Sequence, residues 1–383
     1  MIRRLFGLIP LLHLYIGLRL LPDLFLGEVV WLLGIVALIV STILIPMAML
    51  SRRMPERRRA DKIAWAGFLA MGWFSSILVL TLMRDAALLL AATLIWLIDI
   101  DLALQSAMTW SARGVPLIAT LLSIVGFFAA RRRAAVKAVD VPITGLPPAL
   151  RGFTIAQITD VHVGPTVKRD YLNAIVLATN ALGADLIAIT GDMVDGGVGE
   201  LTDHIAPLAN LRARHGVYCV TGNHEYYSGV HAWVAEFRRL GLTVLMNQHV
   251  VIDCRRGDES AQLIVAGVTD FHAEHYDSAH KSDPELALVG VPENAAMKML
   301  LAHQPRSGFA AAQAGFDLQL SGHTHGGQFA PWMFFVRLQQ PFTSGLHRLD
   351  RMWVYVSRGA GYWGPPLRIG APSEISLLRL VLA

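Results

Sequence analysis

Residues Leu318-Gln-Leu-Ser-Gly-His-Thr-His-Gly-Gly-Gln328 carry the pattern from which the fold of the chain's second half can be argued. The short apolar run predicts a β-strand that ends at Gly322, and His323 and His325 follow at once. Alternate side chains of an extended backbone point to the same face, so both imidazoles can enter one small volume. The glycines let the backbone turn sharply and approach whatever the imidazoles hold. Taken alone, the stretch fits a metal site and a polar turn with two solvated histidines equally well.

The composition divides the chain into two parts. Of its 383 residues 54% are hydrophobic and 16% charged, and the mean hydropathy is +0.46. Apolar residues dominate up to about Ala130, whereas the clusters of His, Asp and Asn follow it, which indicates a membrane part before a soluble domain. The basic blocks lie beside apolar runs and not along an aromatic-rich stripe, so we expect no nucleic-acid partner. Cys219 and Cys254 make no disulfide framework and are expected to be buried thiols.

The first part contains several segments that could cross a membrane, which requires about 20 apolar residues. The expected spans are Leu5–Leu21, Val29–Leu50, Ile63–Met83 and Val115–Ala130. Ala86–Leu104 is ambiguous, because Asp99 and Asp101 lie near its end. We expect Arg84–Arg113 to form an outer loop with an apolar portion lying on the membrane.

Basic residues predict the orientation of these spans, because cytoplasmic loops carry an excess of Lys and Arg. Met1–Arg4, Ser51–Lys62 and Arg131–Lys137 are basic, and four spans place all three on one side. The prediction is therefore a membrane domain of about four helices over residues 1–133, integral to the inner cell membrane, with a cytoplasmic C-terminal domain. Prolines within 134–150 predict a linker or an edge strand there.

Residues 151–383 alternate apolar strand patterns with helical ones. The expected strands are Phe153–Thr159, Asp185–Thr190, Gly216–Thr221, Leu263–Val268, Met297–Ala302, Leu318–Ser321, Met352–Val356 and Ile375–Leu380, and the expected helices are Tyr171–Leu182, Leu201–Ala213 and His231–Leu240. This alternation predicts an α/β sheet, in which ligand sites lie beyond the carboxyl ends of the strands. The metal-competent side chains that follow strands are Asp160, His162, Asp192, Asn223, His303, His323 and His325. We expect them to converge.

Five short blocks of this domain resemble the signature blocks of the calcineurin-like metallophosphoesterases. They are Asp160-x-His162, Gly191-Asp192, Gly222-Asn223-His224-Glu225, His303 and Gly322-His323-x-His325, and they occur in that family's order. The resemblance covers about Arg151 to Ala383 and implies an α/β/β/α sandwich-like catalytic domain. The membrane part and the tail Ser357–Gly361 with Glu374 are similar to a membrane-anchored bacterial branch of the family.

The ligand set suits two divalent cations of intermediate hardness, such as Mn, Fe or Zn. The resemblance implies that Asp160, His162 and His325 hold one ion, that Asn223, His303 and His323 hold the other, and that Asp192 bridges them. Two such ions can activate a water and clamp an in-line displacement at phosphorus. The resemblance also implies that His224 protonates the leaving oxygen and that Asp195 orients its ring. A loop-capping role for Asp195 is nearly as well supported.

One departure from the family concerns the grip on phosphate. Phosphoprotein phosphatases have an arginine directly after the aspartate that matches Asp195, and this chain has Gly196. Arg358 or Arg368 could supply that charge, although we favour a surface or structural role for both. A loose cluster of three histidines is expected to form a mobile loop near the site, without a third metal ion; they are His272, His275 and His280.

The segment Phe329–Phe335 is strongly apolar. It is expected to be buried core, with insertion into a membrane surface as the alternative.

The function is open to three hypotheses. The first hypothesis is hydrolysis of a phosphate ester or pyrophosphate. One option for the substrate is a lipid or a lipid-linked nucleotide, as for a UDP-diacylglucosamine pyrophosphohydrolase. The second is a phosphodiesterase or phosphomonoesterase acting on soluble substrates. The third is a membrane-tethered sensor or scaffold that keeps the fold.

Overall fold

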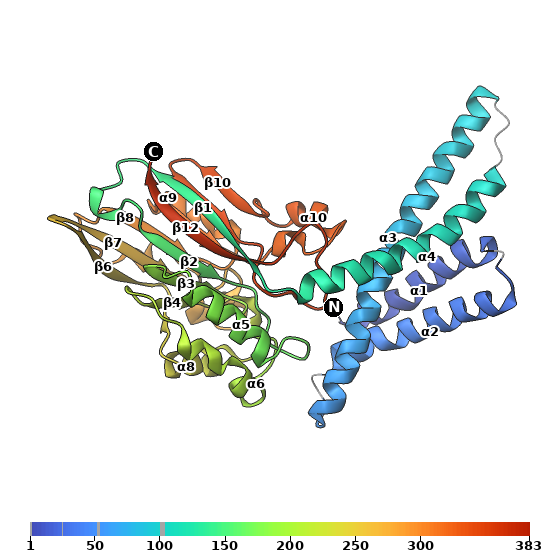
Figure 1. Cartoon of the computed structure of the whole chain (residues 1–383), viewed down its shortest axis with the longest axis horizontal. Coiled ribbons are helices and arrows are strands. Elements are labelled where there is room, and N and C mark those ends of the chain that lie inside the picture. The colour runs from blue at the N-terminus through green and yellow to red at the C-terminus, as the bar shows by residue number, and fades with distance from the viewer. Residues whose placement is uncertain (1, 25, 52–53, 100–103) are drawn as a thin grey trace. The chain divides into compact units, whose positions relative to one another are not determined.

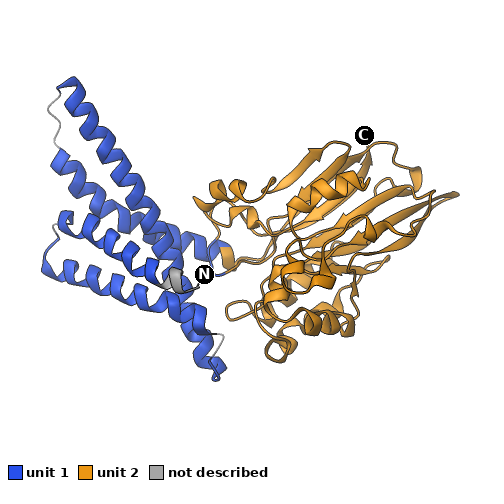
Figure 2. Cartoon of the chain, turned by 180° about the vertical axis from the view of Figure 1, so that it is seen from behind, with its two compact units in different colours: residues 1–129, 364–367 blue, residues 130–363, 368–383 orange. Residues whose placement is uncertain are grey.

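The computed structural model describes residues 2–24, 26–51, 54–99 and 104–383 (Figure 1). Arg52, Arg53 and Asp101, which entered the arguments about charge, lie outside the described residues. The chain forms two compact units (Figure 2). Unit 1 comprises Met1–Ala129 with Gly364–Leu367, and unit 2 comprises Ala130–Trp363 with Arg368–Ala383.

Unit 1 is built from long apolar helices. They are α1 (Ile2–Leu20), α2 (Glu28–Leu50), α3 (Arg57–Ile98) and α4 (Leu104–Arg131). Among the described residues, α2, α3 and α4 are long and apolar enough to cross a membrane. The 19 residues of α1 include Arg3, Arg4 and Arg19, and α1 is not among those three helices. The first expected span therefore stays a prediction.

The expected outer loop from Arg84 to Arg113 is wrong. Helix α3 runs without interruption through Arg84 to Ile98, and α4 already begins at Leu104. The charged residues at this point of α3 are paired within the unit: Arg84 Nη1 lies 3.2 Å from Asp85 Oδ1, and Arg19 Nε lies 2.7 Å from Asp85 Oδ2. Paired charges can stay inside a helical bundle, so they did not end the helix.

Unit 2 contains two six-stranded sheets. The first has the strand order β1 (Ala135–Ile143), β12 (Glu374–Leu382), β2 (Thr154–Ile158), β3 (Leu186–Thr190), β4 (Val217–Val220) and β5 (Thr243–Val244). The second has the order β10 (Gly345–Leu349), β11 (Met352–Val356), β9 (Leu318–Ser321), β8 (Met297–Leu301), β7 (Glu259–Gly267) and β6 (Gln248–Arg256). Strands β2, β3, β4 and β5 run parallel, as do β7, β8, β9 and β11.

Alternation along the strands produces the layers, because successive side chains of a strand point to opposite faces. Ile155 of β2 belongs to the core between the sheets, together with Met299 of β8, whereas Ala156 faces the helices. The helices against the first sheet are α5 (Arg169–Asn180), α6 (Val198–Ile205) and α8 (Val230–Arg239). Helix α9 (Gly308–Gln313) covers the second sheet. The predicted α/β/β/α sandwich is confirmed.

Several elements differ from the expectation. Residues 135–143, left open as linker or edge strand, form the edge strand β1, which pairs in parallel with β12. The sequence pattern did not indicate β5, β6 or β10, of which β5 has only two residues. Cys219 and Cys254 are buried free thiols, as predicted.

Candidate metal centre and active site

The candidate ligands lie where parallel strands of both sheets end. Asp160 and His162 follow β2, Asp192 follows β3, and Asn223 follows β4 as the first residue of the short helix α7 (Asn223–Tyr227). His303 follows β8, and His323 and His325 follow β9. Carboxyl ends of parallel strands meet at one sheet edge, so residues 165 positions apart in the chain can become neighbours.

Most of these residues adopt a backbone conformation that side chains usually avoid. Left-handed φ angles occur at Asp160 (55°), His162 (55°), Asp192 (53°), His323 (70°) and His325 (51°). Non-glycine residues in this region are uncommon, and the strain is concentrated at functional sites, where the surrounding structure holds it in place. The site backbone is therefore shaped for the positions of its side chains.

A first group of ligand atoms comes from Asp160, His162 and His325. The Nε2 atoms of the two imidazoles face each other at 3.0 Å, and His325 Nε2 lies 3.5 Å from Asp160 Oδ1. All three residues are buried. Two imidazoles and a carboxylate at these separations can hold one divalent cation.

A second group comes from Asp192, His303 and His323. Asp192 Oδ2 lies 3.1 Å from His303 Nε2, which in turn lies 3.2 Å from His323 Nδ1. The same Oδ2 is 3.9 Å from Nε2 of His162 in the first group. One carboxylate therefore lies between the two groups.

Asn223 adds an oxygen without a partner. Its Oδ1 is buried and accepts no hydrogen bond within the part of the chain that the structure describes. Leaving such a group unpaired costs about 1–3 kcal/mol, so a buried orphan acceptor needs an explanation. Its neighbour His224 donates its backbone N–H to Asp192 Oδ1 at 2.8 Å, which keeps Asn223 beside the second group. A cation ligated by Asn223 Oδ1 would satisfy that oxygen.

The charge balance of the centre also fits cations. Burial alone would lower the pKa of His303, but the negative charges of Asp192 and Asp160 outweigh it and raise the pKa to about 10. Burial and the charge of His303 lower the pKa of His323 to about 3, which keeps that imidazole neutral, so that one ring nitrogen can offer its lone pair to a metal ion. Divalent cations would neutralise the carboxylates in place of protons. The residues present therefore fit metal ions.

Two glycines let the backbone reach these carboxylates. A Cβ at Gly322 would lie 2.1 Å from Asp160 Oδ2, and one at Gly222 would lie 2.2 Å from Asp192 Oδ1. Both distances are far below any permitted contact, so only glycine fits at either position.

His224 and Asp195 form a pair beside the metal ligands. Asp195 Oδ1 is hydrogen-bonded to Nδ1 of His224 and lies 3.1 Å from Nδ1 of His162. Burial opposes a charged His224, but Asp195 and Asp192 outweigh burial and raise the pKa of His224 to about 9. An imidazolium with its Nδ1 fixed by a carboxylate can donate a proton from Nε2.

Comparison with known proteins agrees with this geometry. Residues 153–327 match the family described as calcineurin-like phosphoesterase. An uncharacterised metallophosphoesterase of Aquifex aeolicus is 32% identical over 59% of this chain and 84% of the relative. The chain belongs to the calcineurin-like phosphoesterases.

Other members of this phosphoesterase family carry the word transmembrane in their names. A transmembrane protein with metallophosphoesterase domain from Bos taurus is 40% identical over 70% of this chain and 62% of the relative. One from Danio rerio is 36% identical over 69% of this chain and 61% of the relative. The chain thus spans less than two thirds of the length of these two relatives. Their names and the apolar helices of unit 1 support membrane association.

The candidate centre is supported by a buried glutamate whose role was not predicted from the sequence. Glu225 Oε2 accepts the backbone N–H groups of Asp192 at 2.9 Å and Gly222 at 2.7 Å, and Oε1 accepts that of Met193 at 2.8 Å. One side chain therefore ties the loop after β3 to the loop after β4. Its place in the Gly-Asn-His-Glu block was the available signal.

Arg368 is a second support and not a grip on phosphate. It is 2% exposed, and its guanidinium donates to the carbonyl oxygens of His325 and Ala371 while Nη2 lies 3.1 Å from Nδ1 of His325. The structural role favoured for Arg368 is what the contacts show. The side chain of Arg358 packs against Gly326: a Cβ added to that glycine would lie 3.0 Å from Arg358 Cγ. The Glu374 carboxylate accepts the backbone N–H of Arg358.

Aromatic side chains surround the catalytic histidine candidate, and the sequence reading did not anticipate them. The ring centroids of Tyr227 and Trp363 lie 5.1 Å and 5.9 Å from that of His224, and Tyr276 lies 5.6 Å from Tyr227. All three aromatic residues are largely exposed. The side-chain amide of Gln328 fixes the backbone of Trp363: Nε2 donates to its carbonyl oxygen and Oε1 accepts its N–H, both at 2.9 Å. The result is an aromatic rim beside His224.

The apolar segment after the candidate ligands was expected to be buried core, and this expectation is wrong for most of it. Phe329 is buried, but the segment continues into α10 (Trp332–Phe335) and a 3-10 helix, η10 (Val336–Leu338), that contain no buried residue. Phe334 is 70% exposed and Leu338 is 85% exposed. We call Trp332, Phe334, Phe335 and Leu338 the apolar knob. Exposed apolar groups gathered in this way are typical of interaction sites.

Proposed function

We propose that this phosphoesterase uses two divalent cations to hydrolyse a phosphate ester or pyrophosphate carried by a membrane lipid or a lipid-linked nucleotide. Asp160, His162 and His325 would hold one ion, and Asn223, His303 and His323 the other, with Asp192 shared. The unpartnered Oδ1 of Asn223 and the position of Asp192 between two histidine groups support two ions. Manganese, iron and zinc all suit this set of ligands.

The protein's own groups account for protonation of the leaving oxygen. Bound divalent cations would supply Lewis acidity toward the phosphate and toward an attacking water. His224 would protonate the oxygen that leaves phosphorus, and Asp195 would keep the imidazole in the orientation that this requires. The raised pKa of His224, which follows from the charges of Asp195 and Asp192 despite burial, supports the role of a proton donor. General acids typically contribute about 10²–10⁴-fold to a rate.

The apolar knob is the observation that carries the choice of a lipid-borne substrate. It begins seven residues after the candidate ligand His325 along the chain, and its side chains are exposed although they are apolar. Burying an acyl chain against such a surface gains about 0.8 kcal/mol per methylene. A lipid-borne phosphate would then bind better than its soluble headgroup, without any difference in the chemical step.

Replacing the knob residues tests this choice of substrate. We expect Trp332→Ser with Phe334→Ser to lower kcat/KM for vesicle-borne substrates, such as phosphatidic acid and UDP-diacylglucosamine, by at least about 10-fold. Hydrolysis of glycerol 3-phosphate and UDP-N-acetylglucosamine should stay unchanged. Phe309→Ser, another exposed aromatic residue of unit 2, is the matched control. Equal losses for lipid and soluble substrates, or no loss at all, would mean that the knob does not select lipids.

We also propose an inner-membrane location with unit 2 in the cytoplasm, because the basic segments flank the helices on one side. Both native cysteines are buried, so we expect them to give little background labelling when reporter cysteines are introduced. Arg132→Cys should react with an impermeant maleimide only after permeabilisation of the cells, and Ser106→Cys should react in intact cells. Labelling of Arg132→Cys in intact cells would contradict this topology.

A further inference from the structure

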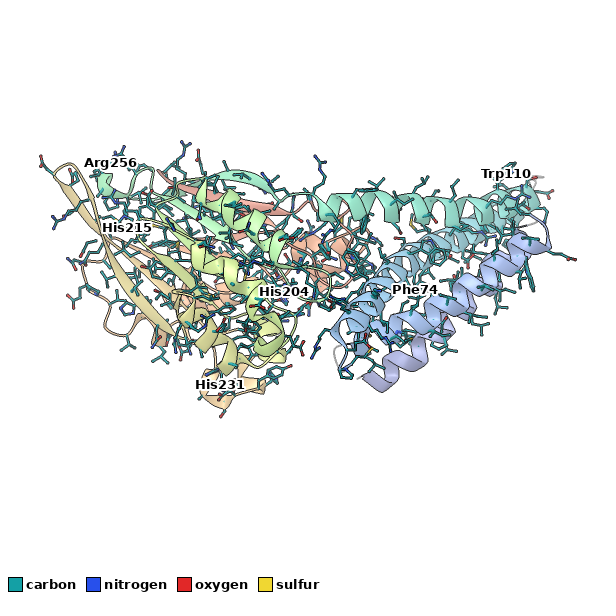
Figure 3. All side chains as sticks on the ribbon, turned by 60° about the horizontal axis from the view of Figure 1, so that its bottom comes forward. Phe74, Trp110, His204, His215, His231 and Arg256 are labelled. Atoms are coloured by element: carbon teal, nitrogen blue, oxygen red, sulfur yellow. The ribbon has the colours of Figure 1, made fainter. Side chains whose placement is uncertain are left out.

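A second group of possible metal ligands lies outside the catalytic centre. His231, in the first turn of α8, has its Nε2 atom 3.1 Å from Asp277 Oδ2. His280 belongs to the 3-10 helix η6 (Ser278–His280), and its Nε2 lies 3.8 Å from the same oxygen. The three ligand atoms all lie within 4.8 Å of one another. His231 is at the surface of unit 2, with its side chain 75% exposed (Figure 3).

Two further polar atoms of the group form contacts outside it. Asp277 Oδ1 accepts the backbone N–H of Ala279 at 3.0 Å, which leaves Oδ2 directed at the histidines. Nδ1 of His280 lies 3.1 Å from the hydroxyl of Tyr226, which leaves its Nε2 for the group. Metal-binding histidines commonly engage their second ring nitrogen in this way, which fixes the orientation of the ring.

We propose that His231, Asp277 and His280 bind a divalent transition-metal ion such as Zn²⁺, at a site separate from the catalytic centre. Two imidazoles and one carboxylate are ligands that zinc accepts, and the exposure of His231 leaves a fourth position open to water. An ion pair is the simpler account of the contacts. An ion pair would account for one histidine that faces Asp277 Oδ2. Here the Nε2 atoms of two imidazoles, His231 and His280, are directed at the same oxygen, and a cation shared by all three groups fits this arrangement better.

The site would fasten the loop that carries part of the aromatic rim. His231 comes from α8, whereas Asp277 follows Tyr276 directly in the loop and His280 lies four residues after it. Tyr276 lies against Tyr226 and Tyr227, with ring centroids 5.9 Å and 5.6 Å apart. Both of those tyrosines belong to α7, the helix that begins with Asn223 and His224. Zinc at this site would therefore hold Tyr276 near the catalytic histidine.

The histidines of this loop do not form the cluster expected from the sequence. His280 was expected to group with His272 and His275, but it lies beside His231, which is 49 positions earlier in the chain. His275 is exposed and belongs to a neighbouring pair with His272, so it is a suitable control. Only the tertiary structure brings α8 to this loop.

Metal content of the full-length, detergent-solubilised protein tests the site. After removal of metal with a chelator and dialysis against Zn²⁺, wild type and His275→Ala should each retain one zinc equivalent more than His231→Ala or Asp277→Asn. The catalytic ligands are present in all four proteins, so weak metal binding there would lower every value and leave this difference intact. Retention of the wild-type zinc content by both His231→Ala and Asp277→Asn would overturn the proposal.

Hydrogen exchange supplies a readout that does not depend on activity. Addition of Zn²⁺ should slow exchange of the backbone amides of residues 270–281 at least about threefold in wild type and His275→Ala. In His231→Ala this slowing should be absent. Equal slowing in His231→Ala and wild type would assign the effect to the catalytic centre and contradict the proposed site.

Discussion

Arg368 holds His325 through two groups of that residue: Nη1 donates to its carbonyl oxygen at 2.9 Å, and Nη2 lies 3.1 Å from its Nδ1. The two residues are 43 positions apart, and both are buried. Burial and the charge of Arg368 lower the pKa of His325 well below its usual value, so the imidazole stays neutral and able to bind metal. A buried arginine thus prepares a candidate ligand.

Arg368→Met should weaken metal binding, because it keeps much of the volume of the side chain and removes its donors. Loss of a group that orients a ligand typically costs about 10–100-fold in metal affinity. Chelator competition measures this affinity, and thermal unfolding reports any loss of folding. Arg348→Met, at an exposed arginine of β10, is the control. Unchanged affinity in folded Arg368→Met would show that His325 needs no such support.

His224→Ala should keep its metal and lose rate. The loss should be about 10²–10⁴-fold for substrates with poor leaving groups, and much smaller for nitrophenyl esters, whose oxygen leaves without protonation. Steady-state kinetics on both kinds of substrate check this, with His272→Ala as the control. An equal loss on both kinds would contradict the role of a general acid.

Asp195→Asn should lower activity through His224, because Asp195 Oδ1 is hydrogen-bonded to Nδ1 of that ring. Residues that act as one unit give non-additive losses, so the substitution should cost much less in a His224→Ala background. A double-mutant cycle of kcat/KM measures the coupling. Additive losses would show that Asp195 acts apart from His224, through its contact with His162 or as the loop cap that the sequence left open.

Glu225→Gln should destabilise the fold. The carboxylate accepts hydrogen bonds from the backbone N–H groups of Asp192, Met193 and Gly222. An amide keeps one acceptor oxygen, but its NH₂ group would face a backbone N–H and leave it without an acceptor. An unsatisfied buried group costs about 1–3 kcal/mol. Thermal or urea unfolding measures the change, with the exposed Glu274→Gln as control. A free energy of unfolding equal to that of wild type would remove Glu225 from this role.

The sequence was sufficient for the catalytic sandwich and for the positions of the candidate ligands, because both depend on local patterns. The apolar strand at Leu318–Ser321 and the histidines directly after it can be identified without any knowledge of tertiary contacts. A structural role was expected for Arg368, but its partner His325 could not be predicted, since only the fold brings the two residues together.

The errors have the same physical origin. The outer loop from Arg84 was inferred from the distribution of basic segments along the sequence, whereas Arg84 and Asp85 are paired with Asp23 and Arg19, which lie more than 60 positions earlier. An apolar run such as that around Phe334 reads the same whether its side chains are buried or exposed. In each case the decisive contact, or its absence among the described residues, is long-range.

Asp192→Asn tests the central claim most directly, because its carboxylate lies between the two groups of candidate metal ligands. Metal content and phosphate release would be measured on the full-length protein in detergent, with the exposed Asp258→Asn as control. We predict that wild type and the control carry metal and release phosphate, whereas Asp192→Asn loses metal and releases none. Wild-type turnover with full metal occupancy in Asp192→Asn would contradict the account.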